Sequence, residues 1–246
     1  MNIMKKTNSD PTPVYYKLQK ILQNEIERGR WSPGEKISPE RSLAELHRVS
    51  INTVKKAILN LVHEGYLYRI QGKGTFVAGT TLRSESLRYY RLLSDFKDDE
   101  AHLKVKLLAL KTIKCFRPAN HYLDLDLNED LYEIKRIFSS SENPIVYTIS
   151  YLPQKMFENL SEYPITLFEK TTLYEALEKN YGLPTIYNHE LFGAVKADAE
   201  TAKKLEIPKG TALQFIEMIS FTYRDRPYEY RRSYCNSDQR KIFREI

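Results

Sequence analysis

Residues 50–79 read SINTVKKAILNLVHEGYLYRIQGKGTFVAG, and a change of pattern within this stretch decides the fold of the first third of the chain. In its first half, apolar residues recur at the spacing of one helical face, at Val54, Ala57, Ile58 and Leu61. Ser50 is placed to cap this helix, and Gly65 is placed to end it. After Gly65, two runs rich in aromatic and β-branched residues flank the turn Gln71-Gly72-Lys73-Gly74, which predicts a β-hairpin.

Two further helices are predicted upstream. The first begins near Val14, carries its apolar residues on one face and ends at Gly29. The second is expected to be capped by Ser38, to have Pro39 at its first position and to close near His47. Three short helices followed by a hairpin are the order of a winged helix-turn-helix module, which places its last helix in the major groove of DNA.

The charge distribution supports DNA binding by this segment. Residues 1–79 contain 13 Lys and Arg against 7 Asp and Glu, whereas residues 80–246 contain 25 against 25, so the net charge of +6 belongs to the first third. A basic module joined to a neutral one indicates that only the basic module meets a polyanion, through release of counterions from phosphates.

The same segment carries the signature of a known family, in Pro33-Gly34, Glu40-Arg41-Ser42-Leu43-Ala44, Glu64-Gly65 and Gly72-Lys73-Gly74-Thr75-Phe76-Val77. It resembles the GntR family of bacterial transcription regulators. The resemblance implies that Arg41 and Lys55 read base edges, since a guanidinium can grip guanine O6 and N7 together. It also implies that the wing approaches the backbone, with Arg69 and Lys73 near phosphates. The DNA-binding residues expected in this way are Arg41, Ser50, Asn52, Thr53, Lys55, Lys56, Arg69, Gly72, Lys73, Gly74 and Thr75.

The chain departs from the family pattern in two places. Ile37-Ser38-Pro39 stands where the family usually has Leu-Pro-Ser, and Ser50-Ile51 stands where it has Ser-Arg. Loss of that Arg removes one base or phosphate contact, so the operator is expected to differ from the family's usual sequence. An alternative role for Arg41 is an ion pair with Glu45, one helical turn away.

The remainder of the chain alternates strand and helix signals and predicts an α+β domain with an antiparallel sheet. Strands are expected over residues 104–116, 131–139, 145–152, 185–197, 212–223 and 228–235. Helices are expected near residues 123–128, from a Thr172–Glu175 capping box to Gly182, and from Asp198 through Leu205. We therefore expect a winged helix-turn-helix domain over residues 10–79, a linker over 80–94, and a second domain over 95–246.

The second domain also resembles a known one, through Tyr151-Leu152-Pro153, Thr172-Leu173-Tyr174-Glu175, Leu205-Glu206-Ile207-Pro208 and Arg226-Pro227-Tyr228-Glu229-Tyr230. It is similar to the effector domain of the HutC branch of the same family, the UTRA domain. That resemblance implies a chorismate-lyase-like fold without lyase activity, dimerisation, and binding of a small molecule such as a sugar or phosphosugar. The effector-binding residues expected are Arg136, Tyr151, Glu229, Arg231 and Tyr234.

Guanidinium groups suit phosphate, and carboxylate and phenol groups suit sugar hydroxyls. Phe138 and Thr148 stand where the branch has a second Arg and a Glu. Two alternatives stay open. Arg136 could be a partly exposed strand residue, and Glu229 could be an ion-pair partner of Arg231 or Arg232. The 18 tyrosines are typical of a sheet face more than of a ligand site.

Other function classes find little support in the sequence. The five histidines are scattered, Cys115 and Cys235 lack metal-site spacing, and no nucleophile motif occurs, so we expect no catalytic residue, no metal and no cofactor. No apolar run is long enough to span a membrane. The sequence thus predicts a cytoplasmic, homodimeric repressor that binds a double-stranded operator and a small-molecule effector. The alternative is an architectural protein that coats DNA without sequence specificity and has a degenerate second domain.

Overall fold

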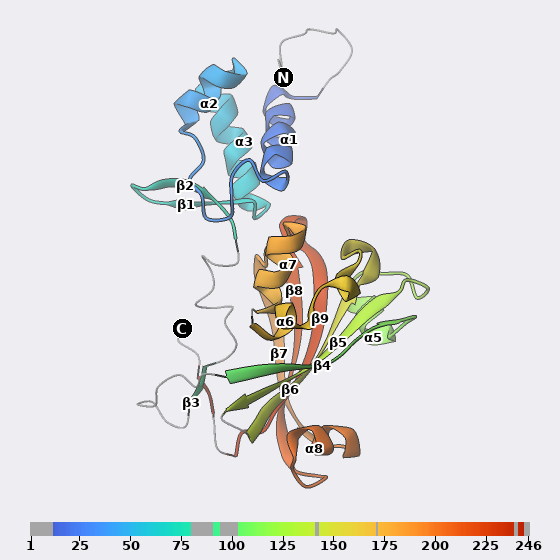
Figure 1. Cartoon of the computed structure of the whole chain (residues 1–246). Helices are drawn as coiled ribbons and strands as arrows, with labels where there is room; N and C mark the ends of the chain where they lie inside the picture. The colour runs from blue at the N-terminus through green and yellow to red at the C-terminus, as the bar shows by residue number, and fades with distance from the viewer. Residues whose placement is uncertain are drawn as a thin grey trace. The chain divides into compact units, whose positions relative to one another are not determined.

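The computed structural model describes residues 12–79, 91–93, 103–140, 143–170, 172–238 and 241–243 (Figure 1). These residues form two compact units. Of the described residues, the first unit comprises 12–79, 177–186 and 222–226, and the second comprises the others. Most of the expected linker, residues 80–90 and 94, lies outside the described residues.

The first unit contains the expected winged helix-turn-helix module. Its elements are α1 (Val14–Glu27), α2 (Glu40–His47), α3 (Ile51–His63), β1 (Leu67–Ile70) and β2 (Gly74–Val77), with β1 and β2 paired antiparallel. Apolar residues from all three helices are almost completely buried, among them Leu18, Leu22, Leu43, Val54, Ala57, Ile58 and Leu61. The helical spacing of these side chains therefore forms the core of the module.

The ends of the helices show why the chain turns where it does. Ser50 caps α3 as expected, because its Oγ accepts a hydrogen bond from the Thr53 N–H at 3.1 Å. Gly65 follows α3 with φ +76°, in the left-handed region that glycine adopts at little cost. The prediction that Ser38 caps α2 is wrong. The Leu43 N–H bonds to the Pro39 carbonyl at 3.0 Å, so Pro39 is the capping residue and the helix begins at Glu40.

The second unit is built on a six-stranded sheet with the order β4-β5-β6-β9-β8-β7. Its strands are β4 (Leu103–Ile113), β5 (Leu131–Ser140), β6 (Asn143–Pro153), β7 (Tyr187–Lys196), β8 (Ala212–Thr222) and β9 (Arg226–Cys235). A separate pair, β3 (Arg91–Leu93) and β10 (Lys241–Phe243), is also antiparallel. The predicted antiparallel α+β architecture is confirmed, although β3 and β10 were not predicted.

The helices around the sheet are α5 (Arg117–Tyr122), α6 (Ile165–Lys170), α7 (Leu173–Tyr181) and α8 (Ala199–Leu205). The Thr172–Glu175 capping box and the Asp198 cap are both present. The prediction of a helix near residues 123–128 is wrong. Asp124 has a φ of 55°, which is incompatible with continuation of α5. The side-chain amide of Asn120 donates hydrogen bonds to the Asp126 and Glu129 carbonyls, so this stretch is a loop whose backbone is bound by the buried Asn120 side chain.

The register of the strands divides the side chains of the sheet between two faces, because directly opposite residues on antiparallel strands point to the same side. Arg136 lies opposite Thr148, and Ser150 lies opposite Arg231. We call the face that carries Arg136, Thr148, Ser150, Glu229 and Arg231 the arginine face. The opposite face, which we call the tyrosine face, carries Tyr147, Tyr151, Tyr230 and Tyr234, and the apolar side chains of α5 and α8 pack against it.

Candidate DNA-binding and effector sites

The start of α3 presents polar side chains to solvent. Asn52 and Lys55 are exposed, and Ser50 and Thr53 are joined by a 2.8 Å hydrogen bond between their hydroxyls. Ile51 occupies the first position of the helix with 43% of its surface exposed. This end of the helix therefore offers hydroxyl, amide and ammonium groups and one apolar side chain.

Arg41 and Lys56, two basic residues on the helices, differ in the contacts that their side chains make. Arg41 is exposed on α2, and within the described residues it makes no ion pair with Glu45. Lys56 is held instead, because its ammonium lies 3.9 Å from the centre of the Tyr15 ring on α1. Arg41 thus keeps its guanidinium available for a ligand, whereas Lys56 is partly committed to the fold.

The wing is tied to the rest of its unit by side-chain contacts and by backbone hydrogen bonds such as that from the Ile37 N–H to the Thr75 carbonyl. Arg69 on β1 forms a 3.0 Å ion pair with Glu40, the first residue of α2. Gly74 has φ +129°, and a Cβ there would lie 2.6 Å from Cε of Lys36. Lys36, which the sequence reasoning missed, therefore places its side chain against the start of β2, next to the tip of the wing. Its bridge to Phe76 could not be read from sequence, because no local pattern links the two residues.

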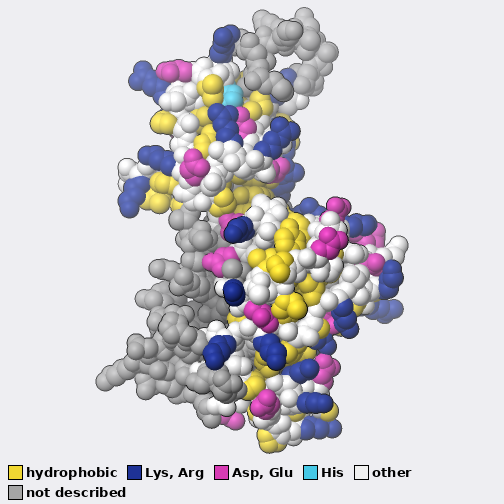
Figure 2. Space-filling model, in the orientation of Figure 1, with side chains coloured by type: hydrophobic (Ala, Val, Ile, Leu, Met, Phe, Trp, Pro, Cys, Tyr) yellow, Lys and Arg dark blue, Asp and Glu magenta, His cyan; other side chains and the backbone are white. Residues whose placement is uncertain are grey.

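Gly72 and Lys73 form the tip of the wing. Gly72 has φ +74° and open space around it, and Lys73 is exposed. Figure 2 shows Lys and Arg side chains gathered over the wing at the left of the view. The tip is therefore a narrow basic projection that can approach a phosphate backbone closely.

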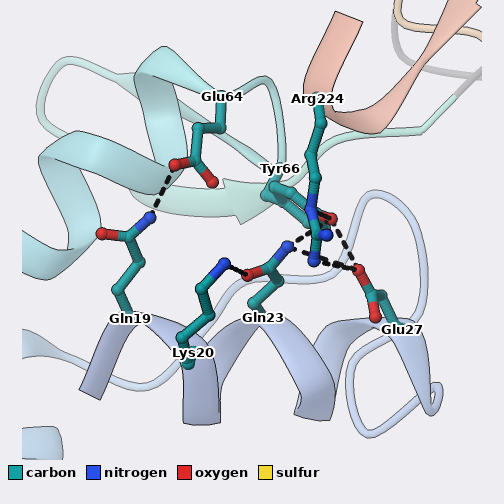
Figure 3. A network of polar contacts seen from close by, with 7 residues as sticks. All are labelled: Gln19, Lys20, Gln23, Glu27, Glu64, Tyr66 and Arg224. Carbon is teal, nitrogen blue, oxygen red and sulfur yellow. Dashed lines mark hydrogen bonds and ion pairs between the residues drawn. The ribbon is translucent and has the colours of Figure 1, made fainter. Parts of the chain in front are cut away.

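A network of polar contacts centres on Tyr66, at the end of α3 in the first unit (Figure 3). The Tyr66 hydroxyl donates to Glu27 at 2.6 Å and accepts from Gln23 at 2.7 Å and from the Arg224 Nε–H at 3.0 Å. Burial and the Glu27 carboxylate raise the pKa of Tyr66 above its usual value. The Tyr66 ring also stacks on Tyr223 with centroids 4.2 Å apart. The turn Thr222–Arg226 is thereby joined to the helices of the module.

Arg136 is the most unusual side chain of the second unit. None of its surface is exposed, and its three guanidinium nitrogens have no hydrogen-bond partner within the described residues. Its guanidinium carbon lies 5.4 Å from the centre of the Phe138 ring. Thr148, directly opposite on β6, also has a buried hydroxyl without a partner in the described part of the chain. The arginine face therefore holds a buried cation and a hydroxyl whose hydrogen-bonding capacity is unused.

Glu229 and Arg231 lie on the same face as Arg136 but bind each other. Arg231 Nε donates to Glu229 Oε1 at 2.8 Å, and Arg231 Nη2 donates to Oε2 at 3.0 Å. Ser220 donates to Glu229, Arg231 also reaches Ser150, and the Tyr174 ring of α7 lies 5.0 Å from the guanidinium of Arg231. Of the alternatives that the sequence left open for Glu229, the structure shows the ion pair with Arg231.

The five expected effector residues do not form one cluster. Tyr151 and Tyr234 lie on the tyrosine face, whereas Arg136, Glu229 and Arg231 lie on the arginine face. Tyr151 donates to Glu133 at 3.4 Å and stacks on Phe116, and burial raises its pKa. Tyr234 packs against Tyr147 and Phe215. These two tyrosines contribute to the packing of α5 and α8.

Family models match both parts of the chain. The model described as bacterial regulatory proteins, gntR family, matches residues 15–77, and the UTRA domain model matches residues 100–241. The chain belongs to the GntR family. The combination of these two domains places it in the HutC branch, whose members are transcription regulators that bind DNA operators and small-molecule effectors.

Individual relatives agree with this assignment. The HTH-type transcriptional regulator YurK of Bacillus subtilis is 30% identical over 89% of this chain and 90% of its own length. The HTH-type transcriptional repressor NagR of the same organism is 25% identical over 97% of this chain and 96% of its own. A ligand-binding domain of a GntR-family regulator from Bordetella bronchiseptica is 26% identical, with a TM-score of 0.59, and covers 65% of this chain and 98% of that one.

Two features are absent from the described residues. Their His, Cys, Asp and Glu side chains form no group arranged to hold a metal ion. None of the helices in these same residues combines the length and apolar character needed to cross a membrane.

Proposed function

We propose that this GntR-family regulator is a cytoplasmic, homodimeric repressor that leaves its operator when an anionic small molecule binds the second domain. We assign the DNA-binding domain to residues 10–79, the linker to 80–94 and the effector domain to 95–246, and we assign no catalytic role to any residue. The repressor assignment is supported by the name of the relative NagR.

For DNA recognition, the proposal assigns base reading to Arg41 and Lys55, assisted by Asn52 and Thr53. Arg41 is exposed and forms no ion pair with the described residues, which supports this role, because a bidentate contact to guanine requires two guanidinium N–H groups. Lys73 and Gly72 serve the phosphate backbone from the tip of the wing. Arg69 would have to exchange its ion pair with Glu40 for a phosphate.

For effector recognition, the observation that carries the proposal is the buried guanidinium of Arg136 without a hydrogen-bond partner in the described residues. A buried charge without a partner destabilises the folded state, by about several kcal/mol per ion. A bound phosphate or carboxylate would supply the missing acceptors and offset that cost. The Thr148 hydroxyl and the Glu229 carboxylate lie on the same face and could bind the hydroxyls of a sugar.

Because the Arg136 side chain is completely buried, the effector can reach it only if the side chains that cover it move. Effector binding would therefore select a conformation that differs from the effector-free one. To release an operator, this selection must be coupled to the placement of the two DNA-binding modules, for which about 1–3 kcal/mol is a typical coupling free energy. The linker over residues 80–94 is one covalent connection through which the coupling can pass.

The proposal is tested first by fluorescence-anisotropy titration of DNA taken from upstream of the protein's own gene, against a scrambled duplex at near-physiological salt. A preference of about a thousandfold or more establishes sequence-specific binding. Equal, weak binding to both duplexes would instead favour the architectural protein.

Once an operator is found, sugar phosphates, the matching unphosphorylated sugars, carboxylated sugars and inorganic phosphate are added to the complex in parallel. Release by a phosphorylated or carboxylated sugar, but not by the neutral sugar, is the expected result. Release by the neutral sugar alone would contradict the role assigned to Arg136.

A further inference from the structure

The two edges of the six-stranded sheet differ in a way that bears on assembly. Strands at sheet edges expose unpaired backbone groups, and proteins commonly protect such edges with lysines, bulges or covering groups. β4 has all three. Its exposed lysines are Lys104, Lys106 and Lys111, its register shifts between Leu107 and Ala109, and the Leu107 N–H is capped by Glu169 Oε1 at 3.0 Å.

β7, at the other end of the strand order, has none of these protections at its centre within the described part of the chain. Residues 191–195 are Leu-Phe-Gly-Ala-Val, without charge or proline. Leu191 is 67% exposed and Phe192 is 48% exposed, which is unusual for large apolar side chains on neighbouring positions. An apolar edge of this kind would promote pairing with another strand.

The charges of β7 indicate which strand that is. Glu190 and Lys196 lie three residues before and three residues after Gly193, and the register with β8 puts both on the same face of the sheet. If two copies of β7 pair antiparallel about Gly193, each Glu190 lies directly opposite Lys196 of the second copy. In the neighbouring symmetric registers that preserve the faces, the same charges lie opposite Ala194 or Phe192. Charge complementarity therefore selects a single register.

We propose that β7 is the site where a second copy of this chain binds, through antiparallel pairing of the two β7 strands about Gly193. The proposal rests on the homodimer proposed above and names its interface. In this register Leu191 lies opposite Val195 of the second copy and Phe192 lies opposite Ala194 of the second copy, so the exposed apolar side chains become covered. Gly193 suits the two-fold axis, because it has no side chain at the point where the two backbones are closest.

The total charge of this part of the chain does not oppose such an assembly. Residues 80–246 contain equal numbers of acidic and basic residues, so two effector domains do not repel each other through net charge. Pairing would also join the two sheets without using the arginine face, which stays available to the effector.

A charge exchange in the full-length protein tests the proposal. Glu190→Lys places two lysine pairs across the axis, Lys196→Glu places two glutamate pairs, and the double variant restores two attractive pairs in reversed order. Each directly opposed pair contributes modestly, so we expect each single variant to weaken the dimer by about tenfold or more and the double variant to recover most of the loss. Dimer dissociation constants are measured by sedimentation equilibrium at low and at high salt, and the differences should shrink at high salt.

Lys106→Glu provides the matched control, because it makes the same change on an exposed lysine of β4, and it should leave the dissociation constant unchanged. Circular-dichroism melting verifies that each variant is folded, and Leu191→Asp provides a second disruption of β7 that does not depend on the ion pairs. Single variants that dimerise like the parent, or a double variant that does not recover, would overturn the interface. A parent protein that dimerises elsewhere would leave the proposed repressor function standing, whereas loss of operator preference in the parent would refute that function separately.

Discussion

At the scale of single residues, Arg136 is a position where stability and function oppose each other. Its guanidinium is buried without hydrogen bonds in the described residues, so the effector-free fold bears a desolvation cost. We predict that Arg136→Met raises the free energy of unfolding of the effector-free protein by about 1–3 kcal/mol. It should also abolish the response of the operator complex to the anionic effector. Urea denaturation and operator titration measure the two effects.

Arg231→Met is the matched control for that prediction. Arg231 makes a bidentate ion pair with Glu229, which is itself completely buried. Removing this guanidinium leaves a buried carboxylate without its cation, so the same substitution should destabilise the protein here, by about 3–5 kcal/mol. If both variants lower stability equally, Arg136 has a partner that the effector-free fold supplies, and the anion-binding role loses its support.

The two cysteines allow a second prediction at this scale. Cys115 is exposed, whereas Cys235 is buried and its burial raises the pKa of the thiol to about 12. Because the thiolate is the reactive form, a raised pKa means that Cys235 stays protonated until the pH approaches 12. We predict that a thiol reagent at pH 8 modifies one equivalent in the folded protein, at Cys115, and two after denaturation. Peptide mapping identifies the modified residue, and rapid modification of Cys235 in the folded state would contradict the packing of β9.

At the scale of elements, α2 and the wing are expected to contribute differently to DNA binding. Arg41→Ala should cost about 1–3 kcal/mol on the operator and relax the preference at one base position. Lys73→Ala should weaken operator and random DNA alike and lower the salt slope by about 1. Titrations of both duplexes at several salt concentrations distinguish the two. An Arg41→Ala variant that weakens both duplexes equally would assign that residue to the phosphates instead.

The elements themselves were predictable wherever the signal was local. The Ser50 cap, the wing and the β5–β6 hairpin depend on residues within a few positions of one another, so their sequence patterns predicted them correctly. The prediction of a helix near residues 123–128 was wrong because the side chain of Asn120 forms hydrogen bonds to the backbone of that loop. Hydrophobic periodicity does not reveal such hydrogen bonds. α6 was missed for a similar reason, since only six residues form it and its apolar pattern is too short to recognise.

At the scale of the whole molecule, the turn between β8 and β9 supplies a second route to the DNA-binding module, through non-covalent contacts. Arg224 and Tyr223 belong to the first unit, where they contact Tyr66, while the strands that flank them carry Ser220 and Glu229 of the arginine face. We predict that Arg224→Ala reduces the effect of the effector on operator affinity by up to about fivefold. The contribution is small because Arg224 and Glu27 are both about half exposed and screened by solvent.

Arg226→Ala serves as the control for this turn, since Arg226 is exposed and lies two residues away on the same segment. Operator affinity is compared with and without a sugar phosphate that releases the parent protein. Equal coupling in both variants and in the parent would show that the turn plays no part and that the linker carries the effect alone.

The sequence by itself determined the types of most elements, the division of charge between the two parts of the chain, and the family. These properties depend on short-range patterns, on totals, or on motifs that need no knowledge of distant contacts. The tertiary structure alone decided which predicted effector residues share a face. Period-two alternation assigns neighbouring residues of a strand to opposite sides, but it does not reveal that β6 pairs with β9 or in which register. That pairing set Arg231 beside Ser150 on one face and Tyr234 beside Tyr147 on the other, and the strand order left β7 at the edge of the sheet.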